Sequence, residues 1–335
     1  MTTVLFRCDG LSMLGHLSRC MALAEALREI GWRAVFRSAQ GDAGRALLTA
    51  GGFEARAVTD FEPEADARHT AAAAKEIQAA WIVLDGYEFT PAFADRLADT
   101  GAKVLVIDDF AAWPRYPAHA VLNCDIGAET LCYPPGPARL LLGPQYFLAR
   151  LSLRRMRKKP RTYSSVARLC IAFSGDASGE RTFTALRAFE HTGSHVRPIV
   201  ADGPRRGDIE RTLALMGRES RLRLIPQDIS EDLAWADAVI CTGGMIKYEA
   251  IFLGVFPLVA SNTPAEASDT ERWLSLGVGV DLGPLSTFDE STAPRALAAL
   301  SAAGATRRQD VMQRAQALFT DDPTRAAAQA LVDLS

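Results

Sequence analysis

Residues 4–20 read VLFRCDGLSMLGHLSRC, and this stretch decides the fold of the first half of the chain. The apolar run at 4–6 predicts a strand, and apolar residues at helical spacing from Leu17 to Leu27 predict a helix. The stretch is therefore typical of a strand, a glycine-containing loop and a helix. The start of such a helix presents unpaired backbone N–H groups, which attract anions such as phosphate.

His16 falls at or next to the predicted helix N-terminus. The positive end of the helix dipole disfavours the imidazolium form, so we expect the pKa of His16 to be lowered. A neutral histidine beside a phosphate-binding helix end is a candidate general base. The alternative is a surface or helix-capping residue that takes part in no chemistry.

The composition describes a globular protein of 335 residues, 48% hydrophobic, with a net charge of −3. That length fits two domains, and the slight acidity argues against nucleic-acid binding. No apolar run is long enough to span a bilayer, and Arg7 and Asp9 come too early for a signal peptide. The six scattered cysteines form no C-x-x-C pair and have no zinc spacing. We therefore expect free thiols in a reducing cytoplasm, with no metal site and no cofactor.

Short apolar runs alternate with helical patterns along both halves of the chain. In the first half we predict strands at 3–6, 33–37, 81–85, 103–108, 120–123 and 140–142, with helices at 17–30, 43–50, 71–79 and 91–100. In the second half we predict strands at 168–173, 195–200, 222–225, 238–241, 256–259 and 278–281. The helices of this half are expected at 180–190, 206–217, 229–234, 245–252 and 267–275, with a final helix pair at 293–334. Helical crossovers between buried strands predict two α/β, doubly wound, Rossmann-like domains that face a cleft.

Residues 154–161 read RRMRKKPR, a basic run between the two α/β patterns. We interpret it as part of a linker at 153–165 between an N-terminal domain (1–152) and a C-terminal domain (166–335). We expect the last helix to pack back toward the N-terminal domain. A patch that contacts anionic lipid is the alternative, although membrane binding is not expected.

A second strand, loop and helix pattern surrounds Thr242, Gly243 and Gly244. Glycines let a backbone approach a phosphate closely, so this loop predicts a nucleotide site, with Glu249 as a candidate acceptor of ribose hydroxyls. A tight turn followed by a solvated glutamate is the alternative. Ser174 and Gly175 follow the first strand of this half, where a ligand loop and a plain connection are equally compatible.

Acidic residues also end predicted strands of the first half, at Asp85 and at 108–109. Their carboxylates could reach a common site, although such residues are often only turn or cap residues. The other histidines show no partner pattern and are interpreted as structural: His69, His119, His191 and His195.

These motifs together resemble the nucleotide-sugar hydrolase family of pseudaminic acid biosynthesis and the related spore-coat polysaccharide proteins. The first-loop pattern R-x-D-x-x-x-x-x-G-H-x-x-R-C-x-x-L-A is matched by Arg7, Asp9, Gly15, His16, Arg19, Cys20, Leu23 and Ala24. Further matches are D-x-Y at Asp85 and Tyr87, the acidic pair at 108–109, and G-P-x-Y-x-L from Gly143 through Tyr146 to Leu148. The pattern G-G-x-x-x-x-E-x-x-x-L-G falls on Gly243, Gly244, Glu249, Leu253 and Gly254.

The resemblance implies the GT-B fold and hydrolysis of a UDP-2,4-diacetamido-2,4,6-trideoxyhexose to UDP and free sugar, with C–O cleavage and inversion. It implies that His16 activates or positions the water. The expected sugar contacts are Asp9, Gly15, Arg19, Asp85, Tyr87 and Tyr146. The expected nucleotide contacts are Ser174, Gly175, Thr242, Gly243, Gly244 and Glu249.

The chain departs from the family pattern at two loops. The loop usually written G-G-x-D reads Ser174-Gly175-Asp176-Ala177, and Ala265 and Glu266 stand where the family carries an Asn-Gln pair. A carboxylate near a diphosphate adds repulsion, so either Glu266 is displaced from the site or the ligand differs. A GT-B glycosyltransferase that uses an acceptor, and a sugar-nucleotide binding protein without turnover, are the alternative functions.

Overall fold

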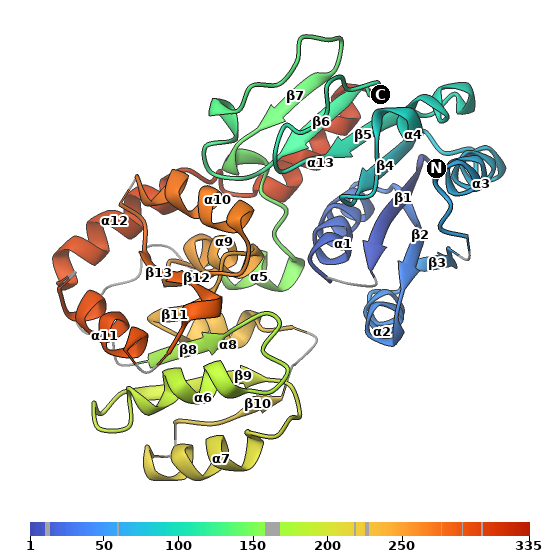
Figure 1. Ribbon diagram of the computed structural model, residues 1–335. Helices are drawn as coiled ribbons and strands as arrows, with labels where there is room; N and C mark the ends of the chain where they lie inside the picture. Colours follow the sequence, from blue (N-terminus) through green and yellow to red (C-terminus); the bar gives the residue numbers. More distant parts are fainter. Residues whose placement is uncertain are drawn as a thin grey trace. The chain divides into compact units, whose positions relative to one another are not determined.

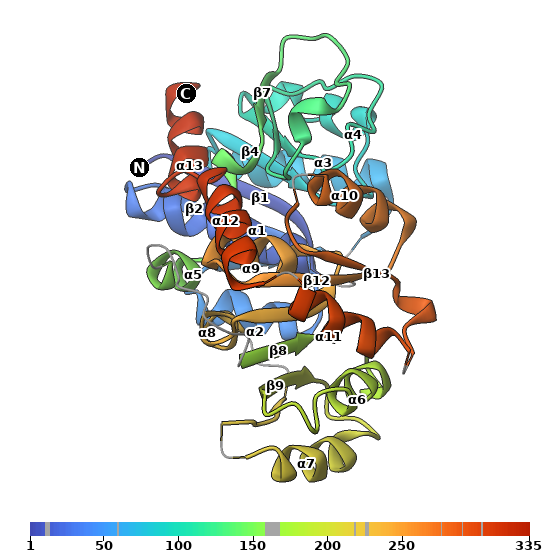
Figure 2. The ribbon, with the colours of Figure 1, turned by 90° about the vertical axis from the view of Figure 1, so that its left-hand side faces the viewer.

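The computed structural model describes residues 1–10, 14–58, 60–157, 168–217, 219–224, 228–275, 277–289, 291–302 and 304–335. The chain divides into two compact units, each built on one parallel sheet with helices (Figures 1 and 2). The first unit comprises Met1–Arg154 with Phe319–Ser335, and the second comprises Arg155–Leu318. Positions 158–165 of the predicted linker, and 158–161 of its basic run, lie outside the described residues.

The sheet of the first unit has seven parallel strands in the order β3-β2-β1-β4-β5-β6-β7. They are β1 (Thr3–Gly10), β2 (Arg33–Gln40), β3 (Glu54–Ala57), β4 (Trp81–Asp85), β5 (Lys103–Ile107), β6 (Ala120–Asn123) and β7 (Arg139–Leu142). β4 and β6 are buried along their whole length, as strands are in a parallel sheet covered on both faces. The strand order reverses between β1 and β4, the point where open α/β sheets bind ligands.

Helices connect the strands from β1 to β5, as is usual for crossovers between parallel strands. The helices of the first unit are α1 (Leu14–Glu29), α2 (Asp42–Ala50), α3 (Pro63–Glu76), α4 (Pro91–Asp95), α5 (Leu151–Met156), which runs over its boundary, and α13 (Pro323–Asp333). Single 3₁₀ turns lie at η1 (Ala98–Thr100), η2 (Ala128–Thr130) and η3 (Pro144–Tyr146). α1 packs against β1, β2 and α13, so the end of the chain belongs to this unit.

The second unit repeats the layout with six parallel strands in the order β10-β9-β8-β11-β12-β13. They are β8 (Arg168–Ala172), β9 (His195–Val200), β10 (Arg223–Leu224), β11 (Ala238–Thr242), β12 (Phe256–Ser261) and β13 (Val280–Pro284). Its helices are α6 (Glu180–Arg187), α7 (Arg206–Leu215), α8 (Ser230–Trp235), α9 (Met245–Leu253), α10 (Pro264–Leu274), α11 (Thr292–Ala302) and α12 (Ala305–Ala317), with the turn η4 (Leu285–Thr287). Here the order reverses between β8 and β11.

The predicted Rossmann-like architecture is confirmed, and the errors fall on polar segments. β3 was not predicted because its sequence, EARA, lies mostly exposed at the sheet edge and shows no apolar alternation. α3 begins eight residues before the predicted start at 71, because the Glu62 carboxylate accepts the backbone N–H groups of Glu64 and Ala65 and Pro63 follows it. The predicted helix at 91–100 is broken into α4 and η1. Helix α5 occupies 151–156, where the predicted linker begins.

The final helix pair predicted at 293–334 is wrong. In the described part of this stretch there are three helices, α11, α12 and α13. Gly304, at a φ of +54°, precedes α12, and the Asp322 carboxylate caps α13 directly before Pro323. Both are ordinary helix boundary signals, hidden by the alanine-rich composition.

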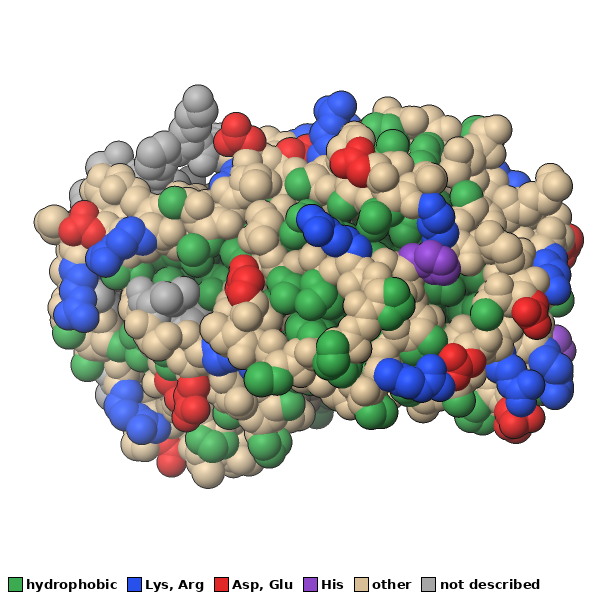
Figure 3. All heavy atoms as spheres, turned by 90° about the horizontal axis from the view of Figure 1, so that it is seen from above, with side chains coloured by type: hydrophobic (Ala, Val, Ile, Leu, Met, Phe, Trp, Pro, Cys, Tyr) green, Lys and Arg blue, Asp and Glu red, His purple; other side chains and the backbone are tan. Residues whose placement is uncertain are grey.

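No helix within the described ranges combines the length and apolar character needed to cross a membrane. On the face shown in Figure 3, basic and acidic side chains are interspersed over the surface.

A buried threonine joins α13 to the rest of the first unit. The Thr324 hydroxyl accepts the Ala149 N–H at 2.9 Å and lies 3.0 Å from the carbonyl oxygens of both Phe147 and Ala149. The Thr324 side chain is fully buried. Loss of the hydroxyl would therefore leave backbone groups without a partner and without access to water.

We predict that Thr324→Val lowers the free energy of unfolding of the first unit by about 1–3 kcal/mol. Urea denaturation followed by circular dichroism measures the shift of the transition. Thr324→Ser retains the hydroxyl and serves as the matched control, with a smaller loss. Equal stability of the Val variant and the natural protein would show that these hydrogen bonds do not hold α13.

Candidate active site

His16 is the third residue of α1 and lies beside the end of β4. Its Nδ1 atom is 2.7 Å from Oδ1 of Asp85, the last residue of β4, and only 5% of the histidine is exposed. Asp85 is an acceptor when ionised, so Nδ1 carries the proton in this contact. The neutral imidazole then keeps its free lone pair on Nε2, the form in which a histidine accepts a proton from a substrate.

Arg19 lies one turn further along α1 and holds Asp85 in place, with its Nη2 atom 3.1 Å from Nδ1 of His16. Its Nε and Nη2 atoms donate to the two carboxylate oxygens of Asp85 at 2.7 and 2.6 Å, and its Nη1 donates to Asp109 at 2.6 Å. Arg19 is 5% exposed. The guanidinium is thus engaged by two buried carboxylates, in the paired geometry that suits arginine. These contacts give Arg19 a positioning role toward Asp85, and its predicted contact with the sugar stays a prediction.

The charges of this cluster set the protonation of its members. Burial alone would raise the pKa of Asp85, but Arg19 and His16 together hold it well below its usual range. Burial would lower the pKa of Arg19, but Asp109 and Asp85 raise it. Asp85 and Arg19 are therefore ionised at neutral pH, and the contacts described above join full charges.

The expected lowering of the His16 pKa is wrong. Burial, the largest single effect, does lower it, but the charge and hydrogen bond of Asp85 outweigh burial, and the pKa is raised above 6.5. The sequence argument counted only the helix dipole, whereas the partner that decides the sign is 69 residues away in the chain. His16 remains a candidate base, with its imidazolium stabilised.

Tyr87 and Asp109 complete the contacts around His16. The Tyr87 hydroxyl donates to Asp109 at 3.1 Å, and the tyrosine ring meets the His16 ring edge-on with centroids 4.7 Å apart. Tyr87 is 61% exposed, so one side of this ring is available to a ligand. Cys20 adds a weak contact, with its Sγ 3.4 Å from Asp85. In the sequence, Asp109 was one of several acidic residues at strand ends. Its position after β5 was the feature that could have predicted its place in this site.

The other residues predicted to contact the sugar come from three elements of the first unit. Gly15 precedes His16 in α1, and Asp9 lies near the end of β1. Tyr146 lies in η3 after β7, and β7 is three strands from β4 in the sheet order. Tyr146 thus follows the carboxyl end of a strand in the same parallel sheet as Asp85.

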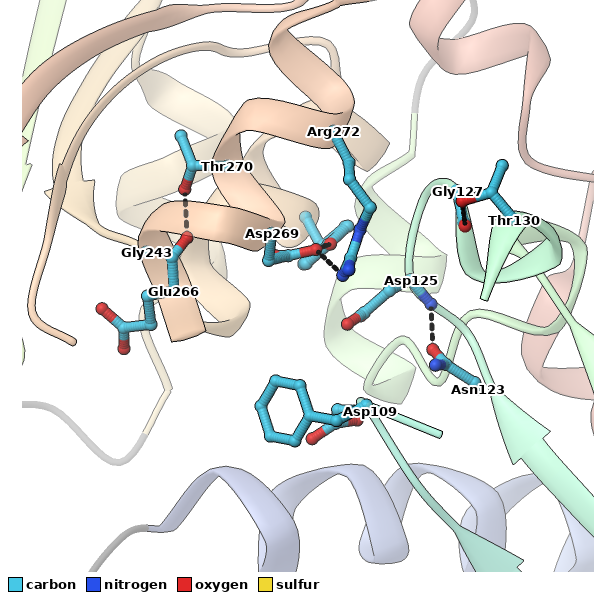
Figure 4. A network of polar contacts seen from close by, with 12 residues as sticks. Asp109, Asn123, Asp125, Gly127, Thr130, Gly243, Glu266, Asp269, Thr270 and Arg272 are labelled. Carbon is cyan, nitrogen blue, oxygen red and sulfur yellow. Dashed lines mark hydrogen bonds and ion pairs between the residues drawn. The ribbon is translucent and has the colours of Figure 1, made fainter. Parts of the chain in front are cut away.

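In the second unit the loops after β8 and β11 meet at the point where the strand order reverses. The Ser174 N–H donates to the Thr242 hydroxyl at 3.4 Å, which joins the two predicted nucleotide loops. A Cβ at Gly243 would lie 2.7 Å from the Glu266 Cβ, closer than side chains tolerate. Position 243, which Figure 4 shows beside Glu266, therefore requires glycine. Gly244 is the N-cap of α9.

Lys247 supports this loop from within the protein. Its side chain is fully buried, and its ammonium group contacts the Gly243 carbonyl oxygen and the Asp269 carboxylate. Asp269 also accepts from the Tyr248 hydroxyl at 2.9 Å and from Arg272 at 2.9 Å, the pair visible in Figure 4. Lys247 therefore fixes α9 against α10, and its charge is neutralised inside the unit. No local sequence pattern predicted the pairing of Lys247 with Asp269.

Two further residues predicted to contact the nucleotide are Glu249 and Gly175. Glu249 lies on α9 and is 7% exposed. Gly175 has a φ of +78°, which glycine adopts freely, and Asp176 accepts the Thr182 N–H at 2.9 Å and the Thr182 hydroxyl at 2.8 Å. The unusual Ser174-Gly175-Asp176 loop thus uses its carboxylate to cap α6. No group of three His, Cys, Asp or Glu side chains suited to a metal ion occurs within the described ranges.

No protein-family model matches the chain. The spore coat polysaccharide biosynthesis protein SpsG of Bacillus subtilis (strain 168) is 23% identical over 198 residues, which cover 55% of this chain. The match spans 56% of that relative's length, little more than half of it. At this identity the similarity is weak, and it does not establish a family for the chain.

Solved structures match over nearly the whole chain. MurG of Acinetobacter baumannii has a TM-score of 0.67 at 14% identity, covering 99% of this chain and 100% of that one. A UDP-glucosyltransferase of Polygonum tinctorium has a TM-score of 0.68 at 13% identity, covering 100% and 98%. The calicheamicin glycosyltransferase CalG4 has a TM-score of 0.62 at 17% identity, covering 100% and 98%. The chain therefore has the GT-B fold, which by itself does not specify a reaction.

We predict that Asp85→Asn lowers the pKa of His16, because the carboxylate that opposes burial is removed. The natural protein should keep His16 protonated to a pH above 6.5, and the variant should lose the proton at lower pH. NMR titration of the imidazole signals measures both values, with His16→Gln to assign the resonance.

Asp95→Asn is the matched control, since Asp95 is an exposed aspartate paired with Arg115. It should leave the titration of His16 unchanged, and circular dichroism should show that both variants are folded. An unchanged His16 pKa in folded Asp85→Asn would contradict the proposed charge balance.

Proposed function

We propose that the protein is a nucleotide-sugar-dependent glycosyltransferase in which His16 activates an oxygen nucleophile. The observation that carries the proposal is the His16–Asp85 contact at 2.7 Å, fixed by Arg19 at the point where the strand order of a GT-B unit reverses. The glycosyltransferases among the similar structures support transfer to an acceptor as the reaction.

The proposed chemistry follows from the tautomer of His16. Nε2 takes the proton of an acceptor hydroxyl as its oxygen attacks the anomeric carbon, and the bond from that carbon to the diphosphate oxygen breaks. The bonding electrons leave with the nucleoside diphosphate, and attack from the opposite side inverts the anomeric centre. Asp85 stabilises the imidazolium that forms, the role of the carboxylate in histidine-based triads. Arg19 keeps Asp85 ionised and in place.

The two units contribute different groups to this proposal. For the nucleotide we propose the loops of the second unit, with the residues Ser174, Gly175, Thr242, Gly243, Gly244 and Glu249. Backbone N–H groups at the start of α9 would stabilise the negative charge of the departing diphosphate. For the sugar we propose the first unit, with the residues Asp9, Gly15, Arg19, Asp85, Tyr87 and Tyr146.

Hydrolysis is the second candidate, with water in place of the acceptor. The first-loop pattern around His16 and the similarity to a spore coat polysaccharide biosynthesis protein favour it. The substrate would then be a UDP-2,4-diacetamido-2,4,6-trideoxyhexose, and the free sugar would enter nonulosonic acid or surface polysaccharide synthesis. Both reactions need the same base and the same leaving group, so the nucleophile is the only difference.

The test is UDP release from a panel of UDP-sugars, with and without candidate sugar acceptors, with products identified by mass spectrometry. A transferase releases UDP in proportion to glycosylated acceptor and releases little without it. Equal amounts of UDP and free sugar without acceptor would identify a hydrolase. UDP binding without any release over the whole panel would contradict both and indicate a binding protein.

We predict that His16→Asn lowers kcat by about 10²–10⁴-fold, because proton transfer to a positioned base contributes a factor of that size. The Kd for UDP should stay the same, since the proposed nucleotide residues lie in the other unit. Steady-state kinetics and calorimetry measure the two quantities. His69→Asn, a substitution of an exposed histidine on α3, is the control and should keep full activity. Near-normal kcat in His16→Asn would remove His16 from the mechanism.

A further inference from the structure

Glu266 lies against the glycine loop that we propose as the nucleotide site. It is the third residue of α10, and its Oε2 accepts the Asn262 N–H at 2.6 Å. A Cβ at Gly243 would lie 3.0 Å from Oε2, and a Cβ at Gly244 would lie 3.9 Å from Oε1. Figure 4 shows Glu266 next to Gly243. Glu266 therefore lies against this loop and is not turned away from it.

Glu266 takes part in none of the ion pairs found among the described residues. Lys247, the nearby lysine of α9, is fully buried and is paired with Asp269. Glu266 is only half-buried, and its carboxylate oxygens lie against the Gly243–Gly244 loop. Its negative charge therefore stands beside the start of α9.

This charge acts differently on a nucleotide sugar and on the released nucleotide. Both phosphates of the donor are esterified, whereas the product carries a terminal phosphate that ionises a second time near about pH 6. Above that pH the product has about one more negative charge than the donor. Repulsion from a fixed carboxylate is therefore stronger for the product.

We propose that Glu266 sets the charge selectivity of this site, favouring the donor diphosphate over the released nucleoside diphosphate. The inference rests on the proposed function, because it takes the Gly243–Gly244 loop as the diphosphate site. Its consequence is weak product binding and rapid release. The helix dipole of α9 attracts both ligands. Glu266 weakens the binding of the released nucleotide more than that of the donor, because the released nucleotide carries the larger negative charge.

The test is calorimetric titration of UDP and UDP-glucose into the natural protein and Glu266→Gln at about pH 8. Glutamine keeps an oxygen that can accept the Asn262 N–H, so the start of α10 is preserved. We expect the Kd for UDP to fall about tenfold in the variant and the Kd for UDP-glucose to fall about threefold. The difference between the two ligands should shrink at about 1 M salt, because salt screens charges at this partly exposed site.

Glu271→Gln is the matched control, since Glu271 is an exposed glutamate five residues further along α10. It makes the same charge change and should leave both Kd values unaltered. Equal tightening of both ligands, or no change in Glu266→Gln, would overturn the inference while leaving the nucleotide site intact. Absence of UDP binding by both the natural protein and Glu266→Gln would refute the proposed function itself, and the inference with it.

Discussion

The first unit depends on one buried arginine shared between two carboxylates. Arg19 donates two hydrogen bonds to Asp85 and one to Asp109, and these contacts join α1 to the ends of β4 and β5. Without Arg19 two carboxylates would lie buried side by side, an arrangement that costs several kcal/mol or forces one to take up a proton. With Arg19 in place, Asp85 stays ionised and orients His16. The proposed base thus owes its tautomer to a residue that need not touch the substrate.

The proposed ligand of the second unit is an anion, so this unit has to attract negative charge. Lys247 could have supplied positive charge at the glycine loop, but Asp269 neutralises it inside the unit. The loop is left with backbone N–H groups for attraction and with Glu266 for repulsion. Affinity at such a site is set by a difference between two electrostatic effects, so a single carboxylate can tune it. In the proposed function, this balance would make product release depend on the geometry of α9 and α10.

The two sheets could largely be predicted because buried parallel strands are continuous apolar runs bounded by turns. β4, β11 and β12 fall close to their predicted ranges for that reason. The prediction failed for β3, an edge strand with charged residues, and for the helix boundaries of the alanine-rich end of the chain. In these places the local pattern carried little signal, and neighbouring elements or caps decided the structure.

The sequence by itself determined which residues stand at strand ends and helix starts, and so named His16, Asp85 and the Gly243–Gly244 loop as site candidates. Only the tertiary structure decided how those residues are charged. The pKa of His16 is raised because Asp85 lies 2.7 Å away. The charge of Lys247 is neutralised because Lys247 forms a buried ion pair with Asp269. Electrostatic interactions depend on distance in space and on burial, and both are set by contacts between residues far apart in the chain.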